Sequence, residues 1–280
     1  MARASVSAVI PTKNVASIIT PTLDSLRFCD EVVIVDMFSE DDTKTLCCSY
    51  PNVTFYERHD YIYGNFNYGL DVAQGEWILR FDSDEVVSPA LRESIDRVLN
   101  DPHPAFAAYD SACHLFFFGR RLRHGFGKAR RLTLFRKGVT RYTVQSEHEW
   151  LSFTGPIGQL HGYYEHFTNP TISAWIKKID YYTARDVERD SSKTPPSRLR
   201  VALKTLRLFQ RLYLSPHWMA RDGELGFYVS GIVCFAFFLQ HAKLWERLSP
   251  AARLLGAQDV GGAELSDQVV SERAQEDEQR

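Results

Sequence analysis

Gly75-Glu76-Trp77-Ile78-Leu79-Arg80-Phe81-Asp82-Ser83-Asp84-Glu85 is an apolar run that leads into an acidic turn. The run over 76–81 predicts a β-strand, and the carboxylates follow where that strand ends. Carboxylates at positions i and i+2 of such a turn can converge on one hard cation, because Mg²⁺ and Mn²⁺ prefer oxygen ligands. The same turn could instead be solvated and supply negative charge to the start of the next helix.

The first hundred residues repeat this alternation of apolar runs and helical spacings. Strands are expected at 5–10, 32–35, 53–56 and 76–81, and helices at 16–27, 41–49, 65–73 and 88–99. Ser88 before Pro89 favours the start of the last helix, because serine caps helices and proline suits the first helical position. The alternation predicts an α/β fold with a mostly parallel sheet covered by helices.

Three polar segments fall where strands end, and ligands of such sheets bind beyond the carboxyl ends of the strands. These segments are 11–14, 36–42 and 82–85. Asp36 can accept hydrogen bonds from a nucleobase or from ribose hydroxyls. Ser39 or Asp41 can cap the following helix, and both interpretations can hold together. Pro11-Thr12-Lys13-Asn14 is a ligand-binding loop or only a turn.

The order of these segments, with Asn67 between them, resembles glycosyltransferase family 2 and its Rossmann-like GT-A nucleotide-sugar fold. Later segments resemble the branch that contains the lipopolysaccharide core glucosyltransferases: Arg123-His124-Gly125, Leu134-Phe135-Arg136-Lys137-Gly138, His148-Glu149, His166 and the ending from Asp222-Gly223 to 242–246. The resemblance covers residues 5 to 246. It implies an inverting transfer from a UDP-sugar, with Mn²⁺ or Mg²⁺ as cofactor, to a glycolipid or lipopolysaccharide-core acceptor.

The resemblance also implies roles for individual residues. Asp36 would contact the uracil, Asp84 would bind the metal, and Asp82 would hold the ribose or the metal. His166 would touch the metal and diphosphate, although its aromatic surroundings alone would favour a packed, hydrogen-bonded side chain. The other implied donor contacts are Pro11, Thr12, Lys13, Asn14, Ser39, Asn67 and Ser83, and the implied acceptor or phosphate contacts are Arg123, His124 and Arg136.

The catalytic base has two candidates. An inverting transfer needs a carboxylate that takes the proton of the acceptor hydroxyl. Glu149 stands at the position that matches the family, and Glu147 is the alternative. The chain departs from the family pattern at three places on the donor side. Met37-Phe38 replaces the small residues that follow the aspartate in the family, and Asp42 replaces a glycine. Phe66 stands where the family commonly has a basic or polar residue.

The chain is expected to comprise a catalytic domain over 1–189, with a nucleotide-binding half (1–100) and an acceptor half (101–189). A polar linker (190–197), amphipathic and apolar helices (198–248) and a disordered tail (249–280) follow. The tail has few large apolar residues, so it cannot bury enough surface to order itself. The resemblance thus implies an α/β GT-A domain, and we expect C-terminal membrane-associated helices to follow it.

Two features of residues 198–248 predict contact with a membrane. Cations recur along one helical stripe at Arg200, Lys204, Arg207 and Arg211, beside an apolar stripe of Leu199, Leu203, Leu206, Phe209 and Tyr213. A basic amphipathic helix suits an anionic membrane surface, although its apolar side could instead pack on the domain. Residues 225–239 carry no charge but fall short of the about 20 that span a bilayer. They would lie in the membrane interface or form a homo-oligomer.

The cysteines and the first apolar run indicate the cellular compartment in which the protein is expected. Five cysteines without metal-like spacing favour a reducing environment, and the apolar run 6–11 is too short for a signal peptide. We expect a peripheral protein on the cytoplasmic face of the inner membrane. The net charge of −2 neither favours nor excludes binding to nucleic acid, and no nucleic-acid partner is expected.

Two other functions fit parts of the sequence. A nucleotidyltransferase also uses paired acids on a parallel sheet. It would usually carry a loop rich in glycine and basic residues after the first strand, and residues 11–14 lack this composition. A non-catalytic membrane adaptor could retain a nucleotide-binding fold. The presence of Asp82, Asp84, Glu149 and His166 speaks against the adaptor.

Overall fold

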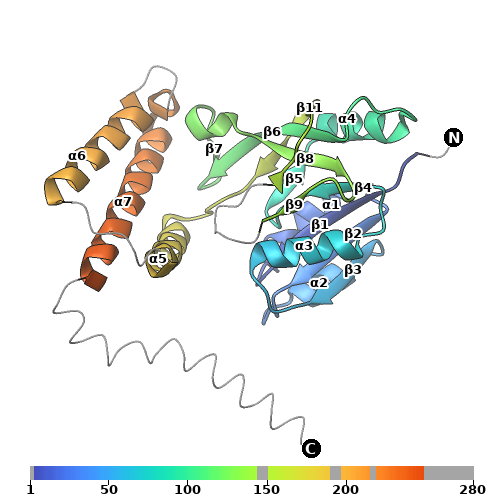
Figure 1. Cartoon of the computed structure of the whole chain (residues 1–280), viewed down its shortest axis with the longest axis horizontal. Helices are drawn as coiled ribbons and strands as arrows, with labels where there is room; N and C mark the ends of the chain where they lie inside the picture. The colour runs from blue at the N-terminus through green and yellow to red at the C-terminus, as the bar shows by residue number, and fades with distance from the viewer. Residues whose placement is uncertain (1–2, 144–150, 190–196, 215–218, 249–280) are drawn as a thin grey trace, which may run out of the picture. The chain divides into compact units, whose positions relative to one another are not determined.

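The computed structural model describes residues 3–143, 151–189, 197–214 and 219–248 (Figure 1). The chain divides into two compact units, residues 1–171 and 172–280. This boundary precedes the expected one at 189, because α5 (Ile172–Arg189) packs on α7 (Gly223–Leu248). Lys243 pairs with Asp180 at 2.7 Å, and Gln240 donates to Asp186 at 3.0 Å. Glu147, Glu149, most of the expected linker and the expected tail lie outside the described residues.

Within the described residues of the first unit, nine strands form one sheet in the order β3-β2-β1-β4-β8-β6-β11-β5, with β7 beside β6. A second, two-stranded sheet pairs β10 with β9. The strands are β1 (Val6–Thr12), β2 (Glu31–Asp36), β3 (Val53–Glu57), β4 (Trp77–Arg80), β5 (Glu85–Val87), β6 (Ala108–Phe117), β7 (Arg120–Arg121), β8 (Arg130–Arg136), β9 (Arg141–Tyr142), β10 (Leu151–Ser152) and β11 (Gly158–His166).

The strands β3, β2, β1 and β4 are parallel to one another, as the alternation of strands and helices predicts. Beyond β4 the sheet becomes mixed, because β8 lies antiparallel between β4 and β6. The strand β11 then runs parallel to β6 and antiparallel to β5. The α/β class and the GT-A type of sheet are therefore confirmed, with antiparallel strands in the second half.

Helices cover both faces of the parallel half (Figure 1). One core joins even-numbered residues of β1 to α1 (Ile19–Ser25), α2 (Thr43–Cys48) and α4 (Pro89–Asn100). The other core joins Val9, Val33 and Ile78 to α3 (Ile62–Val72). Burial on both faces explains why these strands are continuous apolar runs rather than alternating ones.

The helix α4 begins as the sequence predicts. The Ser88 hydroxyl accepts from the Leu91 N–H at 3.3 Å, and Pro89 occupies the first turn. Gly162 on β11 has a φ of +90°, and a β-carbon there would lie 2.3 Å from the Leu91 nitrogen. Glycine is therefore required where β11 meets the start of α4.

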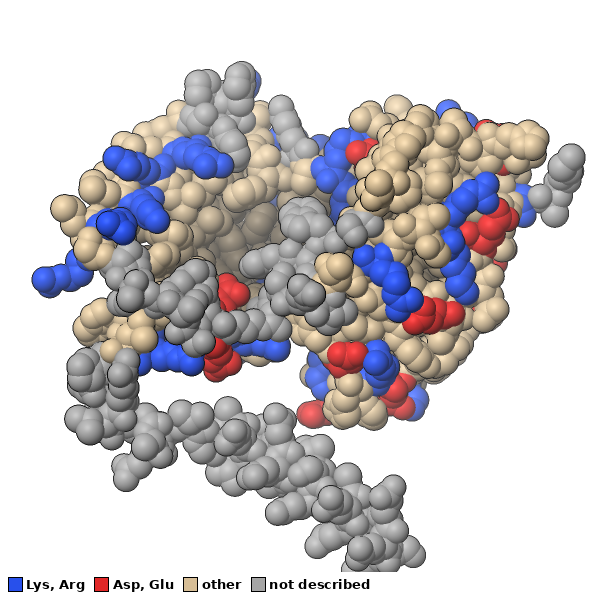
Figure 2. Space-filling model, viewed as in Figure 1, with Lys and Arg blue, Asp and Glu red and all other residues tan. Residues whose placement is uncertain are grey.

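Helices make up the described part of the second unit. α6 (Arg198–Phe209) continues into a π-helical turn, η2 (Gln210–Leu214), and a short 3₁₀ turn, η3 (Met219–Asp222), precedes α7. By length and composition alone, the stretch Met219–Leu248 is long and apolar enough to cross a membrane. α6 buries none of its side chains, and blue side chains gather along it in Figure 2.

Candidate active site

The loops after β1 and β2 are joined by hydrogen bonds at the carboxyl edge of the sheet. Thr12 and Asp36 are partners in the register of these strands. The Asn14 N–H donates to the Ser39 hydroxyl at 2.7 Å, and the Glu40 N–H donates to the Asn14 side chain at 2.8 Å. Asn14 and Phe38 take positive φ values of 51° and 54°. The two loops expected to meet the nucleotide therefore form one structure.

Asp36 lies at the centre of these loops and is 1% exposed. Its Oδ1 accepts from the hydroxyls of Thr12 and Ser39, both at 2.6 Å, and its Oδ2 accepts from the Ser39 N–H at 2.6 Å. A carboxylate offers about four acceptor sites. Three are used by the chain itself, which leaves one on Oδ2 for a ligand N–H or hydroxyl.

An aromatic pair lies beside this carboxylate. The rings of Phe38 and His59 stack with centroids 4.0 Å apart, and both side chains are exposed. The Arg58 N–H bonds the carbonyl of Asp36 at 2.9 Å, which ties the segment after β3 to the end of β2. A flat exposed stack next to a hydrogen-bond acceptor can receive a planar base.

The acidic turn after β4 is held by two arginines, Arg80 and Arg131, that no sequence motif singled out. Arg80 pairs with Asp82 Oδ2 at 3.0 Å, and Arg131 from β8 approaches the same oxygen at 3.3 Å. Burial raises the pKa of Asp82, but the charges of Arg80, Arg131 and His166 outweigh it and lower the pKa to about 2. Asp82 is therefore ionised at neutral pH.

Glu85 is the buried anchor of this turn and has no exposed surface. Arg131 binds both of its carboxylate oxygens, at 2.7 and 2.5 Å, and also donates to the Arg80 carbonyl at 3.3 Å. The Arg131 guanidinium lies 4.7 Å from the ring centre of Tyr164. The Asp82 N–H donates to Glu85 at 2.9 Å, so this ion pair fixes the turn that carries the acids.

His166 closes the site from the end of β11. Its Nε2 lies 3.3 Å from Asp84 Oδ1, and its Nδ1 lies 3.6 Å from Glu85 Oε1. Burial lowers the pKa of His166, but hydrogen bonds to Asp84 and Cys113 and the charges of both acids raise it well above 6.5. The Phe167 N–H bonds the Asp84 carbonyl at 2.9 Å, which keeps the two residues together.

The donor set fits a divalent cation. Among the described residues, Asp82, Glu85 and His166 form a group whose ligand atoms lie within 4.8 Å of one another. Both Glu85 oxygens are engaged by Arg131, whereas Asp82 and Asp84 each keep part of their side chains exposed. Glu85 therefore supports the turn, and Asp82, Asp84 and His166 are the residues that could hold a cation. His166 would then bind as the neutral imidazole, since ligands must be deprotonated.

The remaining donor residues lie at different depths of this edge. Pro11 and Thr12 are buried in β1, Lys13 donates to the Phe38 carbonyl at 2.6 Å, and the Ser83 carbonyl accepts from Thr22 at 2.9 Å. Asn67 is buried, and its amide exchanges two hydrogen bonds with the backbone of Tyr142, at 2.9 and 3.0 Å. Tyr142 in turn accepts from Arg80 at 2.9 Å. Asn67 therefore supports the site through Tyr142.

The predicted acceptor residues are divided between two edges. Arg123 and His124 follow Leu122, whose N–H bonds the carbonyl of Leu115, the register partner of His166. Arg136 instead pairs with Glu76 at 2.5 Å and opposes Trp77 at the start of β4. Because β8 is antiparallel to β4, Arg136 lies at the edge opposite the acidic turn. The structure does not bring it to this site.

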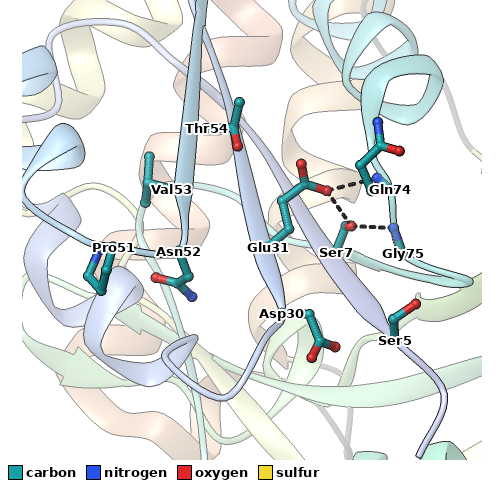
Figure 3. Close-up of a pocket in the computed structure, with 10 residues that line it drawn as sticks. All are labelled: Ser5, Ser7, Asp30, Glu31, Pro51, Asn52, Val53, Thr54, Gln74 and Gly75. Atoms are coloured by element: carbon teal, nitrogen blue, oxygen red, sulfur yellow. Dashed lines mark hydrogen bonds between the residues drawn. The ribbon is translucent and has the colours of Figure 1, made fainter.

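A separate pocket of about 470 Å³ lies at the amino-terminal edge of β1 and β2 (Figure 3). Its Glu31 accepts from the Ser7 hydroxyl at 2.6 Å and from the Gln74 N–H at 2.8 Å. Its Asp30 accepts from the Val6 N–H at 2.8 Å and pairs with Arg3 at 3.1 Å. These acids are occupied by the chain, so the pocket is not a second candidate.

Three comparisons with known proteins bear on this site. The family described as Glycosyl transferase family 2 matches residues 7–154, over half of the 280 residues. A lipopolysaccharide core biosynthesis glycosyltransferase, LpsC of Rhizobium meliloti (strain 1021), is 28% identical over 263 residues, covering 88% of this chain and 94% of that protein. An uncharacterized glycosyltransferase of Rickettsia prowazekii (strain Madrid E) is 25% identical over 254 residues, covering 85% and 86%.

Solved structures give a weaker likeness. The crystal structure of S. aureus TarS 1-349 in complex with UDP-GlcNAc is 15% identical in sequence and covers 92% of this chain and 88% of that one. Its TM-score is 0.44.

Proposed function

Since the chain belongs to glycosyl transferase family 2, we propose that it moves a hexosyl group from a UDP-sugar to a glycolipid or lipopolysaccharide-core acceptor, with inversion and with Mn²⁺ or Mg²⁺ as cofactor. As a family member it is a glycosyltransferase. The choice of acceptor is supported by its likeness to LpsC. The observation that carries the proposal is the cluster of Asp82, Glu85 and His166 after β4, with Asp84 3.3 Å from His166.

The chain's own residues supply binding and orientation. Asp36 offers its remaining acceptor site to the uracil, and the Phe38–His59 stack offers a flat surface beside it. Asp82, Asp84 and His166 would hold the cation, which would offset the charge of the leaving diphosphate. Arg80 and Arg131 fix the acidic turn, so the carboxylates are in place before the donor arrives.

A carboxylate must take the proton of the acceptor hydroxyl, and we assign this role to Glu149. Glu149→Gln is expected to lower kcat at least about 100-fold while donor affinity stays nearly unchanged, because only proton removal is lost. The measurement is steady-state transfer together with calorimetric binding of UDP. Glu147→Gln is the matched control. If the loss follows Glu147→Gln instead, the roles of the two carboxylates are exchanged.

We also propose that the enzyme is a peripheral protein on the cytoplasmic face of the inner membrane. The exposed surface of α6 supports this. Leu199, Leu203 and Leu206 are 70%, 43% and 56% exposed, so these three side chains of the apolar stripe are not covered by the other described residues of the second unit. The four cations of the neighbouring stripe are exposed as well. An amphipathic helix of this kind places its leucines in the lipid and its cations at the headgroups.

Replacing Arg200, Lys204, Arg207 and Arg211 with glutamine is expected to weaken attachment to anionic vesicles by roughly 100- to 1000-fold. Each cation contributes about 1 kcal/mol at such a surface, and the loss should be larger at low salt, where screening is least. Vesicle flotation measures it. The matched control replaces Arg27, Lys44, Arg92 and Arg97, which removes the same charge from the first unit. If the native chain stays in the soluble fraction with every lipid tested, the membrane proposal is contradicted. Residues 225–239 would then be better explained as an interface between copies of the chain.

A further inference from the structure

A groove of about 760 Å³ runs between α6 and α7, within the second unit. Its size falls within the range of small-molecule sites, about 300–1,000 Å³. The side chains that line it and matter here are Arg198, Val201 and Ala202 from α6 and Phe238, Ala242 and Trp245 from α7.

The groove presents large apolar side chains to water. Phe238 is 50% exposed and Trp245 is 64% exposed. The polar ring of His241, which also lines the groove, is bonded through Nδ1 to the Phe237 carbonyl at 2.8 Å. The groove is therefore suited to an apolar group rather than to a sugar, which would need several polar partners.

The cations of α6 have no described partners, and one of them lies at the groove. Among the described residues, no hydrogen bond or ion pair engages the side chains of Arg198, Arg200, Lys204, Arg207 or Arg211. α6 contains no acidic residue that could neutralise them. Arg198 lies at the groove itself. An occupant that complements both features has an apolar chain and an anionic head.

We propose that this groove binds one acyl chain of an anionic lipid, with the lipid phosphate on Arg198. The exposed leucines of α6 lie on a different face of the helix from the groove residues Val201 and Ala202. The helix can therefore lie on a lipid surface while one chain enters the groove. That this lipid is the acceptor rests on the proposed function, but binding of the lipid does not.

The test uses the full chain and dihexanoylphosphatidylglycerol below its critical micelle concentration. Binding is measured by calorimetry and by the fluorescence change of Trp245, identified by its loss in Trp245→Phe. We expect saturable binding that is at least tenfold weaker in Ala202→Phe, which fills the groove. Ala105→Phe makes the same change at an exposed position of the first unit and should bind as the native chain does.

The headgroup is tested separately. Arg198→Gln is expected to lower affinity for this lipid to that for dihexanoylglycerol, which has the same chains and no phosphate. Glycerol 3-phosphate is expected to bind at least tenfold more weakly than the lipid. Equal binding of glycerol 3-phosphate, or unchanged binding in Ala202→Phe, would overturn the proposal. Donor turnover without lipid binding would contradict only the proposal that the groove binds lipid. Lipid binding without donor turnover would contradict only the proposed function.

Discussion

Replacing Asp84 with asparagine is expected to abolish sugar transfer, with a loss of at least about 100-fold. The carboxylate stands at the carboxyl edge, 3.3 Å from His166. A cation at such a site contributes several kcal/mol to the stabilisation of developing charge, and each 1.36 kcal/mol is a factor of ten in rate. Asparagine keeps the shape of the side chain but removes its charge.

Three measurements separate this effect from damage to the fold. Transfer is followed by the release of UDP, and UDP binding is measured by calorimetry with and without Mn²⁺. Binding with Mn²⁺ should weaken, whereas the circular dichroism spectrum should not change. Asp96→Asn is the matched control on the surface of α4, where it should leave transfer intact. Full activity of Asp84→Asn in Mn²⁺ would show that Asp84 is not a ligand.

Replacing Arg131 with methionine is expected to lower the free energy of unfolding by about 3–5 kcal/mol. The change leaves Glu85 buried without its bidentate partner, and removal of one member of a buried ion pair costs about that much. In a domain of this size the midpoint of thermal unfolding should fall by roughly 10 °C. Differential scanning calorimetry measures it.

The neighbouring residue provides a control for this prediction. Arg130 pairs with Asp110 at 2.7 Å, but both side chains are partly exposed. Such a pair contributes about 0–1 kcal/mol, so Arg130→Met should change the midpoint little. Glu85→Gln combined with Arg131→Met should recover much of the stability, because no unpaired charge is then buried. An Arg131→Met chain as stable as the native one would mean that the ion pair does not hold the turn.

The sequence was most informative in the parallel half of the sheet. Each expected strand and helix of the first hundred residues is present within a few residues of its expected bounds, because local apolar periodicity specifies these elements. The antiparallel insertion of β8 was not predicted, because pairing between distant strands leaves no local pattern. That insertion also explains why Arg136 lies at the far edge, since the direction of its strand could not be read from the motif.

The sequence pointed to the acidic residues of the candidate site but not to the arginines that pair with them. Asp36, Asp82, Asp84 and His166 stood out through their places after strands or through the family resemblance. Arg80 and Arg131 were overlooked, although an arginine at the end of an apolar strand and a run of nine cations over 119–141 were available signals. Their partners depend on tertiary contacts between β4, β5 and β8, which one sequence does not specify.

Metal-dependent transfer from a UDP-sugar is tested most directly by the release of UDP from a panel of UDP-sugars in the presence of a lipopolysaccharide-core or glycolipid acceptor. We expect that one UDP-sugar is consumed with formation of a glycosylated product. We also expect that a chelator stops this reaction, that Mn²⁺ or Mg²⁺ restores it, and that Asp84→Asn lacks it. Consumption of no UDP-sugar, or equal consumption in excess chelator, would contradict a metal-dependent transfer from a UDP-sugar.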